Sequence, residues 1–153
     1  MTNEQFRVTK VFLVLCLFAA ACATPAAPKV SYAGEWVGAT SQGEPITFTI
    51  SADETVTSIT AGYAFNGCRG SKVFANLNVS IAPQVVCLPG PCSGPVSSYR
   101  AFSYQSGDVI QEPTTEVHGS LFAGTNAQGT MNFRNYPACG DAIGVAWSAT
   151  RRK

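Results

Sequence analysis

The sequence contains little charge. Only 12% of its 153 residues are charged, with 10 Lys and Arg against 9 Asp and Glu. Proteins that bind nucleic acid neutralise phosphates with clustered Lys and Arg, and here the one such cluster is Arg151-Arg152-Lys153. We interpret these three residues as a solvated segment and expect no nucleic-acid partner.

Histidine is nearly absent, because His118 is the single one. Any Ser-His-Asp or Cys-His mechanism would have to use it, with Ser120, Asp108 or Asp141 as conceivable partners. The chain contains no Gly-x-Ser-x-Gly elbow. The apolar residues beside His118 also place its imidazole on the other face of their strand, toward solvent. We therefore expect a surface histidine, and a hydrolase remains a third hypothesis.

Paired carboxylates are also scarce. Glu112 and Glu116 could be imagined as the acid and nucleophile of a glycosidase, but they flank Pro113-Thr114-Thr115 in an apparent loop, where exposed carboxylates are common. The sequence therefore predicts no enzyme and no cofactor.

Helical periodicity is missing after residue 22, since no window carries apolar residues at i, i+3, i+4 and i+7. Alternation with a period of two replaces it. In the stretch from Pro45 to Gly70, Ile46, Phe48 and Ile50 alternate with polar residues, and 52–54 form a polar turn before a returning strand. Val56 is out of phase in that strand, which predicts a bulge near Thr57 and Ser58.

Similar short segments recur along the chain. We expect further strands at 34–38, 73–81, 98–105, 108–111, 115–123, 130–134 and 144–150. A Pro-rich loop is predicted from Gln84 to Ser97, and a turn from Gly124 to Gly129. The predicted architecture is all-β, an antiparallel β-sandwich or flattened barrel of about eight strands within residues 33–153.

Residues 1–22 have the pattern of a secretory signal, because Arg7 and Lys10 precede an apolar run of 11 residues, too short for a membrane-spanning helix. Ala19-Ala20-Ala21-Cys22 resembles a bacterial lipobox, although Leu is more usual at its first position. It predicts lipidation of Cys22, with the membrane as a partner through that lipid. Ordinary cleavage after the small-x-small triplet Ala21-Cys22-Ala23 would instead release a soluble protein. Residues 23–32 form a Pro/Ala linker.

Six cysteines occur, and Cys16 and Cys22 belong to the leader. Four cysteines in an exported domain favour two disulfides, and we prefer Cys68–Cys139 with Cys87–Cys92, a pair separated by a Pro-Gly-Pro turn. Zinc is the competing interpretation, but structural zinc sites usually use close Cys-x-x-Cys pairs. We expect no metal.

Several residues could form a binding surface. Tyr63, Tyr99, Tyr104 and Tyr136 could stack on a sugar or peptide, although tyrosine is also common in strands. Leu88, between Cys87 and Cys92, could contact a partner in the manner of a constrained inhibitor loop.

Three short motifs carry a family resemblance. They are Gly34-x-Trp36-x-Gly38, the run from Asn66 to Gly70, and Cys139-Gly140 followed by Trp147-x-Ala149. Together they resemble small secreted or lipid-anchored β-domains of bacterial envelope proteins. The resemblance covers Gly34 to Arg151 and implies fold and location alone. The first and last strands are also similar to those of lipocalin- and avidin-type barrels, but the Pro-rich loop interrupts that meander.

These patterns favour an exported, lipid-anchored domain that binds or structures an unknown partner in the cell envelope without catalysis. A small-ligand-binding barrel and a protease-inhibitor-like module that uses the Cys87–Cys92 loop are the alternatives.

Overall fold

The computed structural model describes residues 29–86, 97–107 and 112–153. These residues form an all-β, antiparallel fold, as predicted, with nine strands in place of about eight. The strands are β1 Gly34–Thr40, β2 Pro45–Ile50, β3 Thr55–Phe65, β4 Cys68–Ser80, β5 Ala82–Val86, β6 Ser97–Ser106, β7 Thr114–Phe122, β8 Asn126–Tyr136 and β9 Gly140–Arg151. The leader, most of the linker and the strand expected at 108–111 lie outside the described residues.

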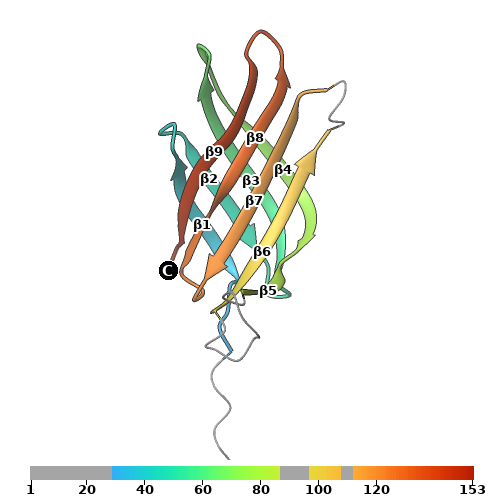
Figure 1. The fold of residues 1–153 in the computed structure, drawn as a ribbon. Helices are drawn as coiled ribbons and strands as arrows, with labels where there is room; N and C mark the ends of the chain where they lie inside the picture. Colours follow the sequence, from blue (N-terminus) through green and yellow to red (C-terminus); the bar gives the residue numbers. More distant parts are fainter. Residues whose placement is uncertain (1–28, 87–96, 108–111) are drawn as a thin grey trace, which may run out of the picture.

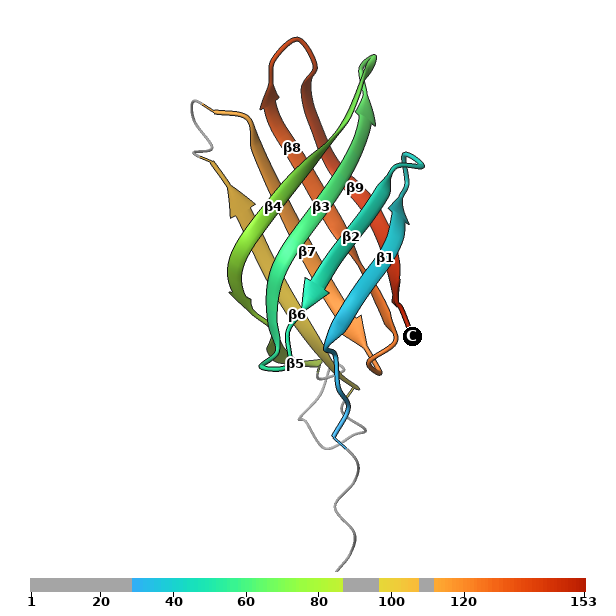
Figure 2. The same ribbon diagram turned by 180° about the vertical axis from the view of Figure 1, so that it is seen from behind.

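All nine strands belong to one sheet, in the order β4-β3-β2-β1-β9-β8-β7-β6-β5. The sheet curls, so that in Figure 1 β6 to β9 lie in front of β2 and β3, and Figure 2 shows β1 to β4 from the other side. The two edge strands, β4 and β5, are consecutive in the chain and separated by Ile81 alone. The architecture is therefore a single curled sheet, which is closer to the flattened barrel than to the two-sheet sandwich.

Aromatic rings fill the inside of the curl. Phe48 on β2 stacks against Trp36 on β1, with ring centroids 5.5 Å apart, and meets Trp147 on β9 at 5.7 Å. Phe102 on β6 lies across the interior, 5.5 Å from Phe48. All four side chains are buried. The alternation of apolar and polar residues in the sequence therefore separates an aromatic interior from a polar exterior.

The chain enters the curl at one end, where polar contacts hold it. The indole N–H of Trp36 donates to the Tyr32 carbonyl at 3.0 Å, and the Arg151 guanidinium donates to the Ser31 carbonyl at 2.5 Å. At the same end Arg100 on β6 pairs with Glu54 in the β2–β3 turn at 3.2 Å. These contacts join the start of the domain to the last strand, and β6 to the β2–β3 turn.

Local predictions have mixed outcomes. The bulge near Thr57 is confirmed, because Thr49 pairs with Ser58 while Ile50 pairs with Val56. The prediction that the Pro-rich loop begins at Gln84 is wrong, because β5 continues to Val86. Pro83 is compatible with this strand because an edge strand has one side without hydrogen-bonded neighbours.

Two further boundaries differ. β8 begins at Asn126, inside the turn expected from Gly124 to Gly129, and β9 begins at Gly140, before the expected position 144. Glycines at 129 and 144 made these segments resemble turns. Gly129 is instead a strand residue, and a Cβ there would lie 1.8 Å from the carbonyl oxygen of His118 on β7.

Gly38 provides a test of how closely β1 and β9 approach. A Cβ at this position would lie 1.8 Å from the Ser148 carbonyl oxygen and 2.5 Å from Cα of Ala149. Gly38→Ala should therefore force backbone movement and lower the free energy of unfolding by about 1–3 kcal/mol or more, measured by urea denaturation. The exposed neighbour provides the control, since Ala39→Ser should change stability by less than about 0.5 kcal/mol. Equal stabilities for the two variants would contradict this packing.

Candidate functional site

A disulfide joins the tips of two hairpins. Cys68 begins β4 and Cys139 precedes β9, and their sulfurs are bonded with Cα atoms 5.9 Å apart. The Asn66 side-chain amide donates to the Cys139 carbonyl at 2.7 Å, which adds a polar link beside the covalent one. The predicted Cys68–Cys139 pairing is confirmed. Cys87, Cys92 and Leu88 lie outside the described residues.

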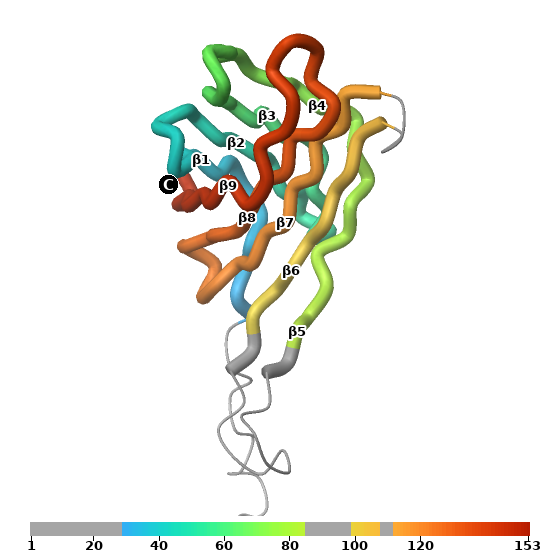
Figure 3. Tube along the Cα trace, turned by 45° about the horizontal axis from the view of Figure 1, so that its top comes forward, coloured from blue at the N-terminus to red at the C-terminus, as the bar shows by residue number. Residues whose placement is uncertain are grey.

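The β1–β2 turn is connected to the same end of the molecule. The side-chain carbonyl of Gln42 accepts from the Ala64 backbone N–H at 2.9 Å, and Glu44 pairs with Arg69 at 3.0 Å. We call these three hairpin ends, residues 41–44, 66–69 and 137–140, the stapled tip. It lies at the end opposite residue 29, as Figures 1 and 3 show.

Below the stapled tip lies a cluster of aromatic rings. Tyr136, at the end of β8, contacts the rings of Tyr63, Phe65 and Phe133 at 5.2, 5.9 and 5.6 Å. Its hydroxyl shares a hydrogen bond of 2.6 Å with the buried Thr115 hydroxyl. Burial raises the pKa of Tyr136 above its ordinary value, because the phenolate loses hydration. Tyr136 is thus a structural residue more than an exposed stacking platform.

The other proposed binding tyrosines have separate surroundings. Tyr104 on β6 packs on Phe74 of β4, with centroids 5.0 Å apart, and burial raises its pKa. Tyr99, on the outer side of β6, packs beside Phe122 of β7 at 5.6 Å. The structure therefore does not bring Tyr99, Tyr104 and Tyr136 into one surface.

His118 is exposed, as the strand phase predicts. Its Nδ1 lies 3.0 Å from the Ser103 hydroxyl on β6, a partner that the sequence did not indicate because it depends on the pairing of β6 with β7. Among the described residues no carboxylate is bonded to the ring, and Asp141 accepts from the Asn135 backbone N–H instead. No hydrogen bond joins Ser120 to the imidazole within the described residues, and Asp108 lies outside them. Within the described residues, His118 therefore belongs to a serine–histidine pair and not to a Ser-His-Asp triad.

The two glutamates have different surroundings. Glu112 is exposed, whereas Glu116 lies within β7 and not in the loop that the sequence suggested. Its carboxylate accepts from the Asn132 amide at 2.6 Å and pairs with Arg134 at 3.5 Å. These contacts give Glu116 a role in joining β7 to β8.

The described residues show neither a metal-binding cluster nor a membrane-spanning helix. Among them, no three His, Cys, Asp or Glu side chains gather where they could hold a metal ion. The same residues include no helix with the length and apolar content to cross a bilayer.

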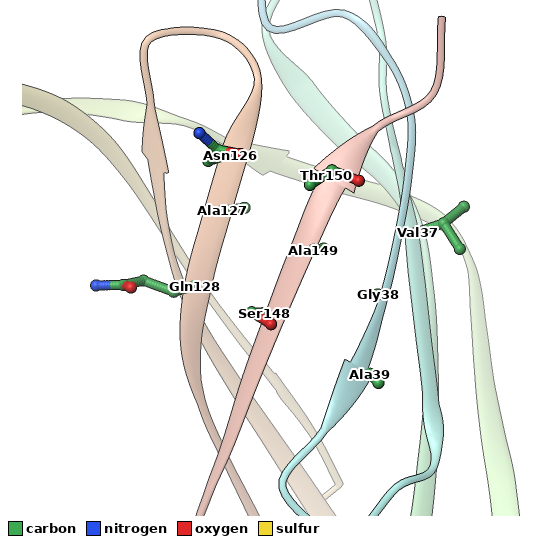
Figure 4. Close-up of a pocket in the computed structure, with 9 residues that line it drawn as sticks. All are labelled: Val37, Gly38, Ala39, Asn126, Ala127, Gln128, Ser148, Ala149 and Thr150. Carbon is green, nitrogen blue, oxygen red and sulfur yellow. The ribbon is translucent and has the colours of Figure 1, made fainter.

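Two shallow hollows lie on the outside of β1, β9 and β8. One has a volume of about 500 Å³, and Figure 4 shows its lining from Val37–Ala39, Asn126–Gln128 and Ser148–Thr150. The second, of about 340 Å³, shares Ala39 and Ser148 with the first and continues to Ser41 and Ala146. Sequence reasoning missed this surface because strands distant in the chain form it.

Among the described residues, one buried side-chain polar atom has no hydrogen-bond partner. The indole N–H of Trp147, whose side chain is 4% exposed, makes no hydrogen bond with the described residues. An unpaired N–H in the interior usually indicates a bound water or another acceptor.

Comparison with family models, curated proteins and solved structures finds no match for this chain.

Removing the disulfide should have a large effect. In the chain-entropy model, closing a loop with a sequence separation of 71 residues stabilises the folded state by about 4 kcal/mol. The double variant Cys68→Ser, Cys139→Ser should lose a similar free energy of unfolding in urea. Ser71→Ala, an exposed change on β4, is the control and should leave stability unchanged. A loss below about 1 kcal/mol would show that the stapled tip does not depend on its covalent link.

Tyr136 should affect stability in two pH ranges. Near neutral pH, Tyr136→Phe leaves the buried Thr115 hydroxyl without its partner, and we expect a loss of about 1–3 kcal/mol. Because the folded-state pKa is raised, the contribution of Tyr136 is full below its unfolded value of about 10 and is lost as pH rises through the folded value. Tyr136→Phe should therefore lose less stability than the wild type between about pH 9 and 12.

The matched control for this experiment is Tyr63→Phe, because the Tyr63 hydroxyl makes no hydrogen bond within the described residues. Its stability at neutral pH should stay close to that of the wild type. Identical alkaline profiles for the wild type and Tyr136→Phe would show that this phenol is not buried as described.

Proposed function

We propose that this chain is an exported, non-catalytic binding domain of the cell envelope, anchored through a lipid on Cys22. The observation that carries the proposal is the Cys68–Cys139 disulfide, which links two hairpin tips at the end of the molecule opposite residue 29. Disulfides persist in oxidising compartments outside the cytoplasm, so this cross-link is consistent with export. The lipobox-like Ala19-Ala20-Ala21-Cys22 supports the anchor.

A lipid anchor on Cys22 would determine how the domain is oriented relative to the membrane. A chain anchored near residue 22 would direct the end that contains residue 29 toward the membrane and the stapled tip away from it. Three hairpin ends joined by a disulfide, an amide–carbonyl bond and an ion pair are already ordered, so they lose little conformational entropy on binding. These features suit a protein that holds a contact surface at a fixed distance from the membrane.

We assign no catalytic role because the candidate catalytic residues Glu116 and His118 make other contacts. Glu116 is occupied by Asn132 and Arg134, and His118 has a serine beside it with no acid among the described residues.

One observation favours the small-ligand alternative. Trp147 has an unpaired indole N–H in the interior, where an acceptor on a small ligand could bind. The rings of Phe48, Phe102 and Trp147 nevertheless contact one another across that interior, so such a ligand would have to displace them. The binding role on the outside of the molecule is therefore preferred.

The anchor can be tested by measuring the mass and location of the mature chain in a bacterial host. We expect a mature N-terminus at a lipid-modified Cys22 and recovery with the membrane fraction. Cys22→Ser should move the protein out of that fraction while its disulfide remains intact. Ser31→Ala, an exposed change in the linker, is the control and should stay with the membrane. An unmodified N-terminus beyond residue 22 would contradict the lipid anchor.

A further inference from the structure

The outer side of β6 to β9 and β1 carries side chains in regular rows. One row runs across the sheet from Tyr99 and Phe122, whose rings are 5.6 Å apart, to Asn126 and then to Thr150, which pairs with Val37. The next row contains Ser120, Gln128, Ser148 and Ala39 in register. We call this surface, centred on Tyr99, Phe122, Asn126, Gln128, Ser148 and Thr150, the neutral face.

The neutral face is hollowed along β9. The hollows of about 500 and 340 Å³ adjoin at Ala39 and Ser148, so that they form one shallow trough between β1 and β8. In Figure 4 the amides of Asn126 and Gln128 lie on one side of this trough and Val37 on the other, with Ser148 and Thr150 between them. Adjacent strands lie about 4.8 Å apart, so the trough offers hydrogen-bonding groups at short, repeated intervals.

Its polar groups are available and uncharged. The side chains of Asn126, Gln128, Ser148 and Thr150 make no hydrogen bond with the described residues. The Asp, Glu, Lys and Arg side chains of β1, β7 and β8 are paired, Glu35 with Arg152 at 3.1 Å, and Glu116 with Arg134 at 3.5 Å. An anionic or cationic ligand would therefore find no free opposite charge in the two rows.

The aromatic side chains of the neutral face are confined to one pair, Tyr99 and Phe122. The large hydrophobic side chains that are exposed in the described residues are Val30, Val73 and Ile143, and none of them belongs to the rows or lines the hollows. The centre of a protein–protein interface is usually apolar and rich in aromatic residues. Here the aromatic pair Tyr99 and Phe122 stands at one end of a surface of hydroxyls and amides, which is a poor match to a second copy of the chain.

We infer that the neutral face binds an uncharged polysaccharide. Such a chain presents hydroxyls to amide and hydroxyl side chains, and the C–H face of a sugar ring packs on an aromatic ring such as Tyr99. The trough is shallow and open at the surface, which suits an extended polymer better than an enclosed small molecule. The inference rests on the proposed envelope function and gives its binding role a ligand class.

The test uses the full processed chain and a panel of soluble probes. Maltohexaose, cellohexaose and chitohexaose in its N-acetylated form are uncharged, and polygalacturonate is the anionic comparison. We expect saturable binding of at least one uncharged probe by calorimetry, weakened about tenfold in Tyr99→Ala and about fivefold in Gln128→Ala. Tyr99→Phe should retain binding because it keeps the ring.

Two exposed positions on β4 provide matched controls. Ser71→Ala and Asn78→Ala remove a hydroxyl and an amide outside the neutral face and should bind as the wild type does. Gln128 is itself exposed, so Gln128→Ala keeps the test valid even if Tyr99→Ala unfolds.

Four results would overturn the inference. Three are binding of polygalacturonate alone, no binding of any uncharged probe, and equal affinities for Gln128→Ala and Asn78→Ala. The fourth is dimerisation in sedimentation that Gln128→Ala abolishes, which would assign the face to a second copy. If the chain is recovered lipid-modified with the membrane while all uncharged probes fail, the envelope function survives and the ligand class falls. Recovery of the chain in the cytoplasm would instead contradict the proposed envelope function.

Discussion

The arrangement of the whole molecule depends on the contact between Phe48 and Phe102. These residues belong to β2 and β6, which are separated by four strands in the order of the sheet, yet their ring centroids lie 5.5 Å apart. The contact requires the sheet to curl, and the right-handed twist of β-strands makes such curling easy. Trp36 and Trp147 complete the packing around Phe48, so the curl is stabilised by burial of large aromatic surfaces and not by a continuous hydrogen-bond ladder between its edges.

The filled interior determines where the protein can bind a partner. With rings from opposite walls in contact, the available surfaces are the two ends and the outside. One end holds the start of the chain through Trp36 and Arg151, and the other is closed by the Cys68–Cys139 disulfide above the Tyr136 cluster. The hollows on the outside of β8, β9 and β1 are lined by uncharged residues. In the proposed envelope role, the first end would be held near the membrane and the other surfaces would remain accessible.

Local patterns in the sequence predicted much of the fold. The alternation at Ile46, Phe48 and Ile50, the bulge at Thr57 and the face occupied by Val145 and Trp147 are all confirmed, because each depends on neighbours within one strand. The predicted strand boundaries near Pro83 and Gly129 are wrong, because both residue types usually interrupt strands. Here Pro83 lies on an edge strand, and Gly129 allows a close approach of the neighbouring backbone. The cross-link between Cys68 and Cys139 could be predicted from the compartment and the even number of cysteines. The Ser103–His118 pair and the trough beside Ser148 could not, since both depend on the register between strands.

The most direct test of this account is the nuclear Overhauser effect between the aromatic protons of Phe48 and Phe102 in the folded protein. A centroid separation of 5.5 Å places ring protons well within range, so we predict strong cross-peaks between these two rings and from Phe48 to Trp147. Cross-peaks from Phe48 to Trp36 should also be present, but these rings lie on neighbouring strands and would be seen in a flat sheet as well. Neighbour-strand cross-peaks without the Phe48–Phe102 contact would mean that the sheet is open, and the account of a filled interior with outward-facing binding surfaces would be wrong.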